Sequence, residues 1–313
     1  MKKIISLLAV LMLLCGCSQS SSSKYRVGVV QLVQHDALDK ATQGFVDVLK
    51  EEFGDEIDID VQIASGDSNT CSTIATNFVA ENVDLIMANA TPALQAVANA
   101  TNTIPVLGTS VTEYGVALDI DNFNGLVGNN ISGTSDLAPL DQQAQMVLDL
   151  FPQTKTVGLL YCNSEANSKY QVEVVEKYLQ NKNIKVNRYA FDDSNNVDAV
   201  VKSACEEIDV LYIPTDNTCA SNGGIIANAC NEKNIPIITG EKDTCIKCEG
   251  LATLTIDYYE LGKVTGQMAI RVLKGEDISK MPIENCKNPV KMYRKSSAEK
   301  FGLSMQGYEA IED

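Results

Sequence analysis

The sequence alternates short apolar runs with segments of helical spacing, and this alternation is the feature that most restricts how the chain can fold. The apolar runs have the length and the β-branched content of buried strands, and in the first half they lie at 25–32, 58–63, 84–88 and 103–108. Between them, segments 39–52 and 70–81 repeat apolar residues every three or four positions, which is typical of amphipathic helices. The pattern predicts β-α-β units and parallel sheets, the arrangement of an α/β fold.

The same plan returns in the second half of the chain. Corresponding segments of the two halves are 26–32 and 156–161, 39–52 and 168–180, 83–87 and 208–213, and 103–108 and 234–240. This repetition predicts two lobes of like topology, each a doubly wound parallel sheet with helices on its faces.

The connections between the lobes can also be placed. Strand-like runs at 125–132 and 250–257 each lead into a helix and are suited to cross from one lobe to the other, and a third crossing is expected near 284–292. We therefore assign 25–131 and 256–284 to lobe 1, and 132–255 and 285–313 to lobe 2. A ligand cleft is expected between the two lobes.

The N-terminus has the pattern of an export signal. Two lysines precede an apolar stretch at 4–14, which is shorter than the roughly 20 residues that span a bilayer. The run Leu14-Cys15-Gly16-Cys17 that follows resembles the lipobox of bacterial lipoproteins, which implies cleavage before Cys17 and acylation of that cysteine. We assign 1–16 to a lipoprotein signal peptide and 17–24 to the lipidated cysteine and a flexible serine-rich linker. The protein is expected outside the cytoplasm, lipid-anchored to the outer face of the cytoplasmic membrane.

Charge narrows the possible partners. The formal net charge is −16, with the carboxylates spread along the whole chain. Such a surface repels nucleic acid and keeps an exported protein soluble, so we expect a monomer that binds no nucleic acid.

Eight cysteines remain outside the export signal. They are Cys71, Cys162, Cys205, Cys219, Cys230, Cys245, Cys248 and Cys286. An even number outside the cytoplasm permits disulfides, but the pairing cannot be deduced from the sequence. Cys245 and Cys248 form a Cys-x-x-Cys pair, yet a zinc site would need a second pair or histidines, and His35 is the only histidine. We expect no metal site and leave open a local 245–248 disulfide or free thiols packed as small hydrophobic groups.

Polar residues follow the predicted strands, where open parallel sheets bind ligands. In the first half these candidate ligand-binding residues are Gln31, His35, Thr91, Thr112 and Tyr114; in the second half they are Asn163, Glu165, Asn167, Asp216, Asn217 and Asp257. Thr91 followed by a proline predicts a helix start whose free N–H groups attract an anion. Hydroxyls on one side and carboxylates on the other would suit a zwitterion, with its ammonium at Asp216 or Asp257. The alternative is that each residue only caps a helix.

Several blocks of the sequence resemble the substrate-binding lipoproteins of ABC transporters in the tryptophan and tyrosine uptake group. The blocks are 31–39, 89–93, 163–168, 214–218 and 251–262. The resemblance implies a type I periplasmic-binding fold with a three-segment hinge. It also implies that the lobes close on an amino acid, expected to be aromatic and tryptophan-like, and deliver it to a permease and its ATPase. Tyr114, Tyr161 and Tyr258 are the candidates for an aromatic wall. Asp36, where the family commonly has proline, and the many cysteines depart from the family pattern.

Sequence motifs of enzymes are missing. The chain has no G-x-S-x-G elbow, Walker loop, H-E-x-x-H or G-x-G-x-x-G, so we expect neither catalysis nor a cofactor. Three alternatives stay open: a binding protein for a nucleoside, sugar or other small solute, an extracellular sensor for a signalling partner, and a thiol-redox lipoprotein.

Overall fold

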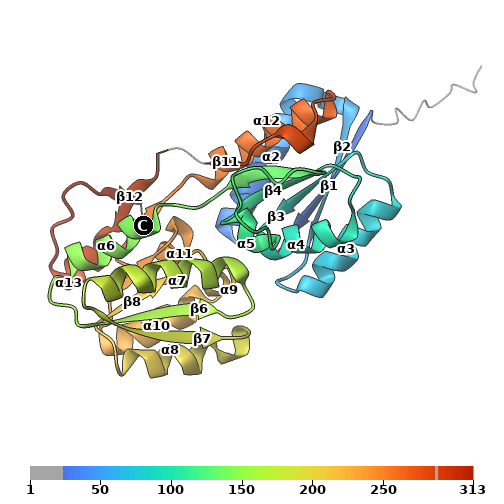
Figure 1. Ribbon diagram of the computed structural model, residues 1–313. Coiled ribbons are helices and arrows are strands. Elements are labelled where there is room, and N and C mark those ends of the chain that lie inside the picture. The colour runs from blue at the N-terminus through green and yellow to red at the C-terminus, as the bar shows by residue number, and fades with distance from the viewer. Residues whose placement is uncertain (1–23, 286–287, 313) are drawn as a thin grey trace, which may run out of the picture.

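The computed structural model describes residues 24–285 and 288–312, which form two lobes joined by crossing segments (Figure 1). The predicted signal peptide, Cys17, nearly all of the serine-rich linker, and Cys286 lie outside the described residues. Within the described part, no helix has both the length and the apolar character needed to cross a membrane.

Lobe 1 is built on a six-stranded sheet of order β11-β5-β4-β3-β1-β2, in which every pair of neighbours is parallel. Its strands are β1 (Tyr25–Gln31), β2 (Ile57–Ile63), β3 (Leu85–Asn89), β4 (Val106–Val111), β5 (Ile131–Ser135) and β11 (Glu284–Asn285). Its helices are α2 (Asp36–Phe53), α3 (Ser68–Ala80), α4 (Thr91–Ala100), α5 (Tyr114–Ala117) and α12 (Tyr258–Leu273), with short 3-10 turns η1 (Gly54–Glu56) and η3 (Ile278–Lys280).

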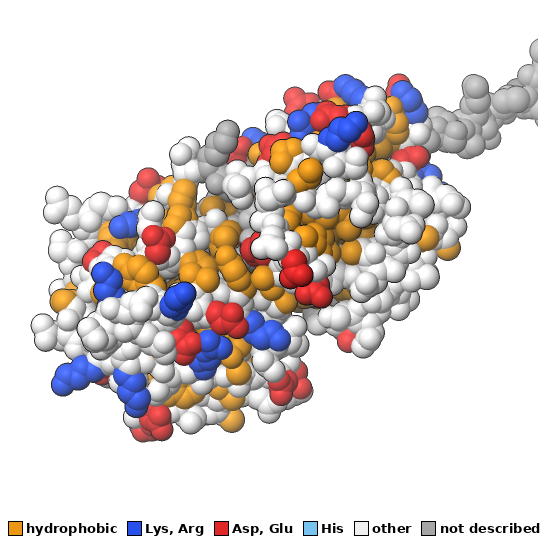
Figure 2. All heavy atoms as spheres, in the orientation of Figure 1, with side chains coloured by type: hydrophobic (Ala, Val, Ile, Leu, Met, Phe, Trp, Pro, Cys, Tyr) orange, Lys and Arg blue, Asp and Glu red, His pale blue; other side chains and the backbone are white. Residues whose placement is uncertain are grey.

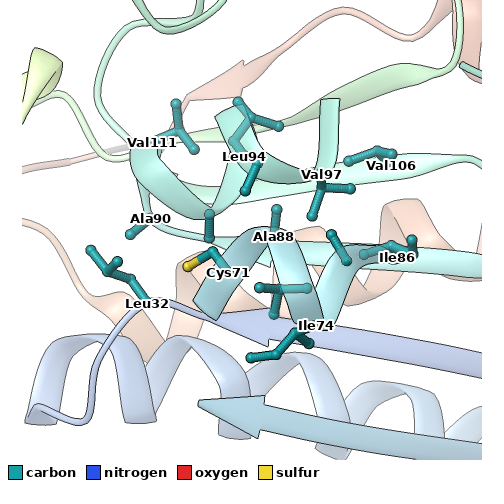
Figure 3. Close-up of a cluster of buried hydrophobic side chains, with 14 of the residues drawn as sticks. Leu32, Cys71, Ile74, Ile86, Ala88, Ala90, Leu94, Val97, Val106 and Val111 are labelled. Carbon is teal, nitrogen blue, oxygen red and sulfur yellow. The ribbon is translucent and has the colours of Figure 1, made fainter. Parts of the chain in front are cut away.

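Helices cover both faces of this sheet. On one face, Leu94 and Val97 of α4 pack with Val106 and Val111 of β4 (Figure 3). On the other face, Phe45 of α2 and residues of α12 pack against the same sheet. Because β3 and β4 are buried along their whole length, they show no alternation of apolar and polar residues, and the first four residues of β3 are all apolar.

Lobe 2 is built on a seven-stranded sheet of order β13-β12-β10-β9-β8-β6-β7, parallel except where β12 pairs with β10. Its strands are β6 (Thr156–Cys162), β7 (Lys185–Phe191), β8 (Val210–Ile213), β9 (Ile237–Thr239), β10 (Ala252–Thr255), β12 (Val290–Arg294) and β13 (Glu309–Ile311). Its helices are α6 (Leu140–Leu150), α7 (Ala166–Asn181), α8 (Val197–Cys205), α9 (Asn217–Ser221), α10 (Gly223–Lys233), α11 (Lys242–Lys247) and α13 (Lys295–Phe301), with the 3-10 turn η2 (Ser194–Asn196). Separate apolar clusters fill the two faces of this sheet. The predicted α/β class with two doubly wound lobes is therefore what the structure has.

One predicted lobe boundary needs correction. The sequence placed the first crossing after residue 131, but β5 pairs in parallel with β4, with Ile131 opposite Val106 and Ser132 opposite Leu107. Lobe 1 therefore extends through Ser135, since the backbone of β5 completes its hydrogen bonds within that sheet. The second crossing follows β10, and the third lies between β11 and β12.

Helices α2 and α12 lie in backbone contact across the outer face of lobe 1. A Cβ atom at Gly262 would lie 2.0 Å from the carbonyl oxygen of Ala41, and one at Gly44 would lie 2.2 Å from that of Tyr259. Only glycine permits this approach. The contact fixes the N-termini of both helices, and these reach the cleft at His35 and Tyr258.

The seven described cysteines are buried and their thiols are free. The Sγ atoms of Cys205 and Cys230 lie 3.5 Å apart where α8 and α10 pack together. Among the described residues, no group of three or more histidine, cysteine or acidic side chains is placed to hold a metal ion.

Candidate functional site

A cavity with about 310 Å³ of empty space lies between the lobes, at the carboxyl ends of strands from both sheets. It is lined by His35, Ala37, Leu38, Ser110, Thr112, Asp136, Asn167, Thr215, Asp216, Asn217, Ala220, Glu241 and Tyr258. The lining comes from both lobes and from two of the crossing segments.

The two lobes touch over this cavity, and their side chains meet along the boundary in Figure 2. His35 Nε2 of lobe 1 lies 3.2 Å from Asn217 Oδ1 of lobe 2. Lys40 Nζ on α2 lies 2.8 Å from Asp243 Oδ1 on α11. These contacts across the boundary describe a closed arrangement.

At the carboxyl ends of three neighbouring strands of lobe 1 lie side-chain oxygen atoms that are buried and have no hydrogen-bond partner among the described residues. These atoms are Thr91 Oγ1 after β3, Ser110 Oγ in β4 and Asp136 Oδ1 after β5. Ser110 and Asp136 line the cavity, whereas Thr91 lies outside its lining. Buried polar groups are nearly always hydrogen-bonded in folded proteins, so atoms at one sheet edge that the protein itself leaves unpaired make this edge a candidate site for ligand contacts.

The backbone is strained at the same edge. Ala90, directly after β3, has φ 94° and ψ 156°, a region that is essentially restricted to glycine. Ser110 has φ 53°, in the left-handed region. Strain of this kind concentrates at binding sites, where it fixes the direction of nearby polar groups.

Asp136 connects the cavity to the hinge. Its Oδ2 accepts a hydrogen bond of 2.9 Å from the hydroxyl of Tyr258, while its Oδ1 has no partner. Asp136 stands on the first crossing segment, and Tyr258 is the first residue of α12, where the second crossing segment ends. The bond therefore joins the two crossings beside the cavity. Burial raises the pKa of Asp136, and the nearby hydroxyls of Tyr258 and Thr112 offset this only in part.

His35 has a defined tautomer. Asn217 donates from Nδ2 to Glu165 Oε2 at 2.6 Å, which leaves Asn217 Oδ1 to face His35. His35 Nε2 must then carry the hydrogen. Burial lowers the pKa of His35, so its ring is neutral and Nδ1 is an acceptor. None of the described residues donates to that nitrogen.

Asn167 is fixed in the same way. Its Nδ2 donates to Glu165 Oε2 at 3.2 Å and to the carbonyl oxygen of Thr215 at 3.1 Å. Its Oδ1 is buried and has no partner. The side chain therefore presents an unpaired acceptor on the lobe 2 side of the cavity.

Glu165 acts behind the lining rather than in it. Its Oε1 accepts from the N–H and hydroxyl of Thr218, and its Oε2 accepts from Asn167 and Asn217. It lines a wider neighbouring hollow of about 710 Å³ that shares Asn217 with the cavity. Glu165 thus orients cavity residues without reaching the cavity.

Two further carboxylates line the cavity as helix caps. Asp216 accepts from the N–H groups of Cys162 and Cys219, both at 2.7 Å. Glu241 accepts from Asp243 N–H at 2.6 Å and from the N–H of Thr244. Burial raises the pKa of each to about 7; the charge of Glu165 adds to this at Asp216, and that of Asp243 at Glu241.

The structure thus brings together five of the predicted ligand-binding residues: His35, Thr112, Asn167, Asp216 and Asn217. Of the three candidate tyrosines, Tyr258 lines the cavity and the other two do not.

Four predicted residues lie outside the lining of this cavity. The amide of Gln31 is used inside lobe 1, where it donates to Asp39 and accepts from a threonine hydroxyl. The hydroxyl of Tyr114 donates to a carbonyl within lobe 1, and Asn163 donates to a surface carboxylate. Asp257 is exposed and accepts from two N–H groups at the start of α12, so it caps that helix.

Sequence reasoning missed Ser110, Asp136, Thr215 and Glu241. A signal existed for Asp136, because it directly follows the strand-like run that forms β5, but that run was interpreted as the lobe connection. Glu241 follows β9 in the same way.

Comparison with known families decides the identification. The profile described as "ABC transporter substrate binding protein" matches residues 26–310. The chain belongs to this family. Its members are binding proteins and not enzymes, and the two-lobe fold is that of type I periplasmic-binding proteins.

Three relatives of this substrate-binding protein are informative. A tyrosine-binding protein from Clostridioides difficile is 37% identical over 305 residues, covering 90% of this chain and 87% of the relative. The solved structure of an ABC domain in complex with L-Trp from Streptococcus pneumoniae has 31% identity and a TM-score of 0.87, covering 92% of this chain and 100% of that one. A ligand-free, open substrate-binding protein with adhesive properties from Clostridium difficile has 35% identity and a TM-score of 0.70, covering 92% and 99%.

The last two values bear on the arrangement of the lobes. The open structure from Clostridium difficile has the higher sequence identity to this chain, 35% against 31% for the L-Trp complex, but the lower TM-score, 0.70 against 0.87. The lobes of this substrate-binding protein are therefore arranged more like those of the L-Trp complex, in agreement with the contacts across the cleft.

Proposed function

We propose that this substrate-binding protein captures an aromatic amino acid, tyrosine or tryptophan, in the interlobe cavity and delivers it to the permease of an ABC importer. The observation that carries the proposal is the unpaired, buried Oδ1 of Asp136 at the cavity wall. The ligands named for two relatives, tyrosine and L-Trp, support the same class of ligand.

The α-ammonium of the ligand would bind Asp136. A buried carboxylate is stable when it is paired with a cation, and none of the residues lining the cavity is lysine or arginine. Tyr258 holds the other carboxylate oxygen and so fixes the direction of Oδ1. Asp216, which the sequence favoured for this role, already uses one oxygen for each of two backbone N–H groups.

The α-carboxylate would bind the hydroxyl edge of lobe 1. Ser110 offers an unpaired hydroxyl in the cavity lining. The N-terminus of α4 at Thr91 lies outside that lining but at the same sheet edge, so its helix dipole favours an anion nearby without a direct contact. Ala90 is the strained residue that turns the chain into this helix. Ser110 and Asp136 lie on adjacent strand ends, so the two charged groups of one amino acid would meet neighbouring partners.

The side chain of the ligand would lie against the apolar part of the lining. Ala37 and Leu38 come from lobe 1, Ala220 from lobe 2, and Tyr258 from the crossing segment. An aromatic ring gains most from such a site because it buries a large apolar area, and Tyr258 adds a ring contact.

Calorimetry with tyrosine, tryptophan and phenylalanine tests the proposal. Asp136→Asn should weaken binding by about 2–5 kcal/mol, the range for removing one partner of a buried charge pair. Asp257→Asn is the matched control and should leave affinity unchanged, since that carboxylate is exposed. If no aromatic amino acid produces heat with the wild type, the ligand class is rejected and nucleosides and sugars become the next ligands to screen. Unaltered affinity in Asp136→Asn would reject the ammonium site.

We also propose that the protein is held outside the cytoplasm by lipid on Cys17 and works with a membrane permease and its ATPase. The Leu14–Cys17 run after an apolar stretch supports the anchor, and the family supports the transporter partners. Cys17→Ser should release the protein from membranes or leave it unprocessed. Unchanged fractionation together with retained acyl label in this variant would refute the anchor.

A further inference from the structure

Two cavity atoms besides Asp136 Oδ1 are acceptors that lack a donor. They are His35 Nδ1 and Asn167 Oδ1, and both belong to side chains that are almost fully buried. An acceptor left unpaired in a buried site costs stability, which a ligand recovers only if it brings a donor. The chemistry of these two atoms therefore restricts the ligand beyond its α-ammonium.

The amide of Asn167 cannot turn over to become a donor toward the cavity. Its Nδ2 faces two acceptors, Glu165 Oε2 and the carbonyl oxygen of Thr215. A flipped amide would place Oδ1 against both of these oxygens and lose both hydrogen bonds. The acceptor is thus held toward the cavity by groups outside it.

His35 is fixed through the same carboxylate oxygen. Glu165 Oε2 also accepts from Asn217 Nδ2, and Asn217 Oδ1 then accepts from His35 Nε2. Both chains of hydrogen bonds end on Glu165, one directly and one through Asn217. A single carboxylate behind the lining therefore sets the polarity of two cavity residues from different lobes.

We propose that Glu165 holds Asn167 and His35 as an acceptor surface, and that this surface selects aromatic amino acids whose ring carries a hydrogen-bond donor. Tyrosine, with its phenol O–H, and tryptophan, with its indole N–H, meet this requirement; phenylalanine does not. This inference rests on the proposed function. Sites that hydrogen-bond a ligand hydroxyl reject the analogue that lacks it, because the site's own polar atoms are left unpaired. Glu165 is a positioning residue here, and Asn167 is the acceptor assigned to the ring donor.

The competing possibility is that the α-ammonium itself satisfies these acceptors, since it has three N–H donors. The two cases differ in selectivity. If the ammonium binds Asn167, replacing Asn167 weakens the binding of every amino acid equally. If the ring donor uses it, removal affects tyrosine and leaves phenylalanine unchanged.

The experiment measures the affinities of tyrosine, tryptophan and phenylalanine for the wild type, Asn167→Leu, Glu165→Gln and the control Asn163→Leu. Asn163 lies in the turn directly before α7, the helix that carries Asn167, but its amide donates to a surface carboxylate. For the wild type we expect phenylalanine to bind at least tenfold more weakly than tyrosine. Asn167→Leu should weaken tyrosine binding at least tenfold and change phenylalanine binding by less than threefold. The ratio of the two dissociation constants, phenylalanine to tyrosine, should then approach one. Glu165→Gln should lower the ratio as well, because its amide no longer fixes both neighbours as acceptors toward the cavity, and Asn163→Leu should preserve it.

Equal affinity of the wild type for tyrosine and phenylalanine would overturn this inference alone, and that comparison does not depend on any variant folding. An equal loss for all three ligands in Asn167→Leu would also overturn it and assign the acceptor to the ammonium. A purely structural effect of Glu165→Gln would lower all three affinities together and leave the ratio intact, which counts against the positioning role. Absence of binding by every aromatic amino acid would instead overturn the proposed function, and this inference with it.

Discussion

At the scale of single residues, the site depends on which polar atoms the protein itself leaves unpaired. Asp216 and Asp136 are both buried aspartates of the cavity lining, yet only Asp136 keeps a free oxygen. Asp216 holds two backbone N–H groups, so its role is to fix the loop and the start of α9. Charge and burial alone would not have separated the two.

The ionisation of Asp136 predicts a pH dependence of affinity. Burial raises the pKa of Asp136, and an ammonium binds only the ionised carboxylate. Affinity should therefore be full at pH values above that raised pKa and fall as the pH drops through it. The fall should begin above the ordinary aspartate range near pH 4. Asp216 and Glu241, whose pKa values are raised to about 7, face the same cavity and should steepen the decline.

Calorimetry from pH 5 to 8 in two buffers of different ionisation enthalpy measures this directly. Ligand binding should release protons, since it favours the ionised form of a group whose pKa is raised in the free protein. If affinity is still constant when the titration is extended down to pH 4, with no proton release, a buried ammonium–carboxylate pair at Asp136 is contradicted.

At the scale of elements, helix caps and helix contacts place the cavity residues. Asp257 accepts from the N–H groups of Tyr259 and Glu260 and so caps α12. Asp257→Ala should lower the free energy of unfolding by about 1 kcal/mol and leave ligand affinity unchanged. Urea titration and calorimetry on one preparation check both quantities. Asp67→Ala is the matched comparison, since Asp67 caps α3 through Thr70 N–H and should lose a similar stability.

The contact between α2 and α12 predicts a larger effect. Gly262→Ala places a methyl group 2.0 Å from the carbonyl oxygen of Ala41, so the two helices must separate. We expect a loss of about 1–3 kcal/mol or more in unfolding free energy. Affinity should also weaken, because His35 and Tyr258 stand at the N-termini of these helices.

Gly224→Ala is the control for that variant. Gly224 lies in α10 with no atom within 4 Å of an added Cβ, so alanine should stabilise the helix by about 0.5–1 kcal/mol. Equal stability of the Gly262 and Gly224 variants in urea titration would contradict the close approach of α2 and α12.

At the scale of the whole molecule, binding depends on closure of the two lobes. Lys40 and Asp243 join α2 to α11, and the carboxylate of Asp243 is 7% exposed. Lys40→Ala removes this interlobe pair and leaves Asp243 without its cation, which disfavours the closed form. Because the closed form binds the ligand, affinity falls in proportion to the loss of closed protein. We expect the dissociation constant to rise three- to tenfold.

Small-angle scattering with and without ligand should show a larger mean radius of gyration for unliganded Lys40→Ala than for the wild type. Lys202→Ala, which removes an exposed pair within α8, should change neither affinity nor shape. Wild-type affinity in Lys40→Ala would mean that this pair does not contribute to closure.

Most of the long strands and helices, the fold class and part of the site could be predicted from the amino-acid sequence. Burial imposes a local periodicity on side chains, so β1 and α2 were predicted to within three residues of their observed ends. Repetition of the plan predicted two lobes. The rule that ligands meet the carboxyl ends of parallel strands located His35, Asn167 and Asp216 in the cavity lining.

Only the tertiary structure decided the lobe boundary, the free acceptors and the closed cavity. Ser135 belongs to lobe 1 because β5 pairs with β4, a contact between segments that the sequence does not link. Asp136 keeps a free oxygen because Tyr258, more than a hundred residues away, takes the other one. Asn167 faces the cavity as an acceptor because Glu165 and Thr215 accept from its nitrogen. Hydrogen bonds of this kind join residues from chain segments that only the fold brings together. Local sequence patterns therefore do not predict them.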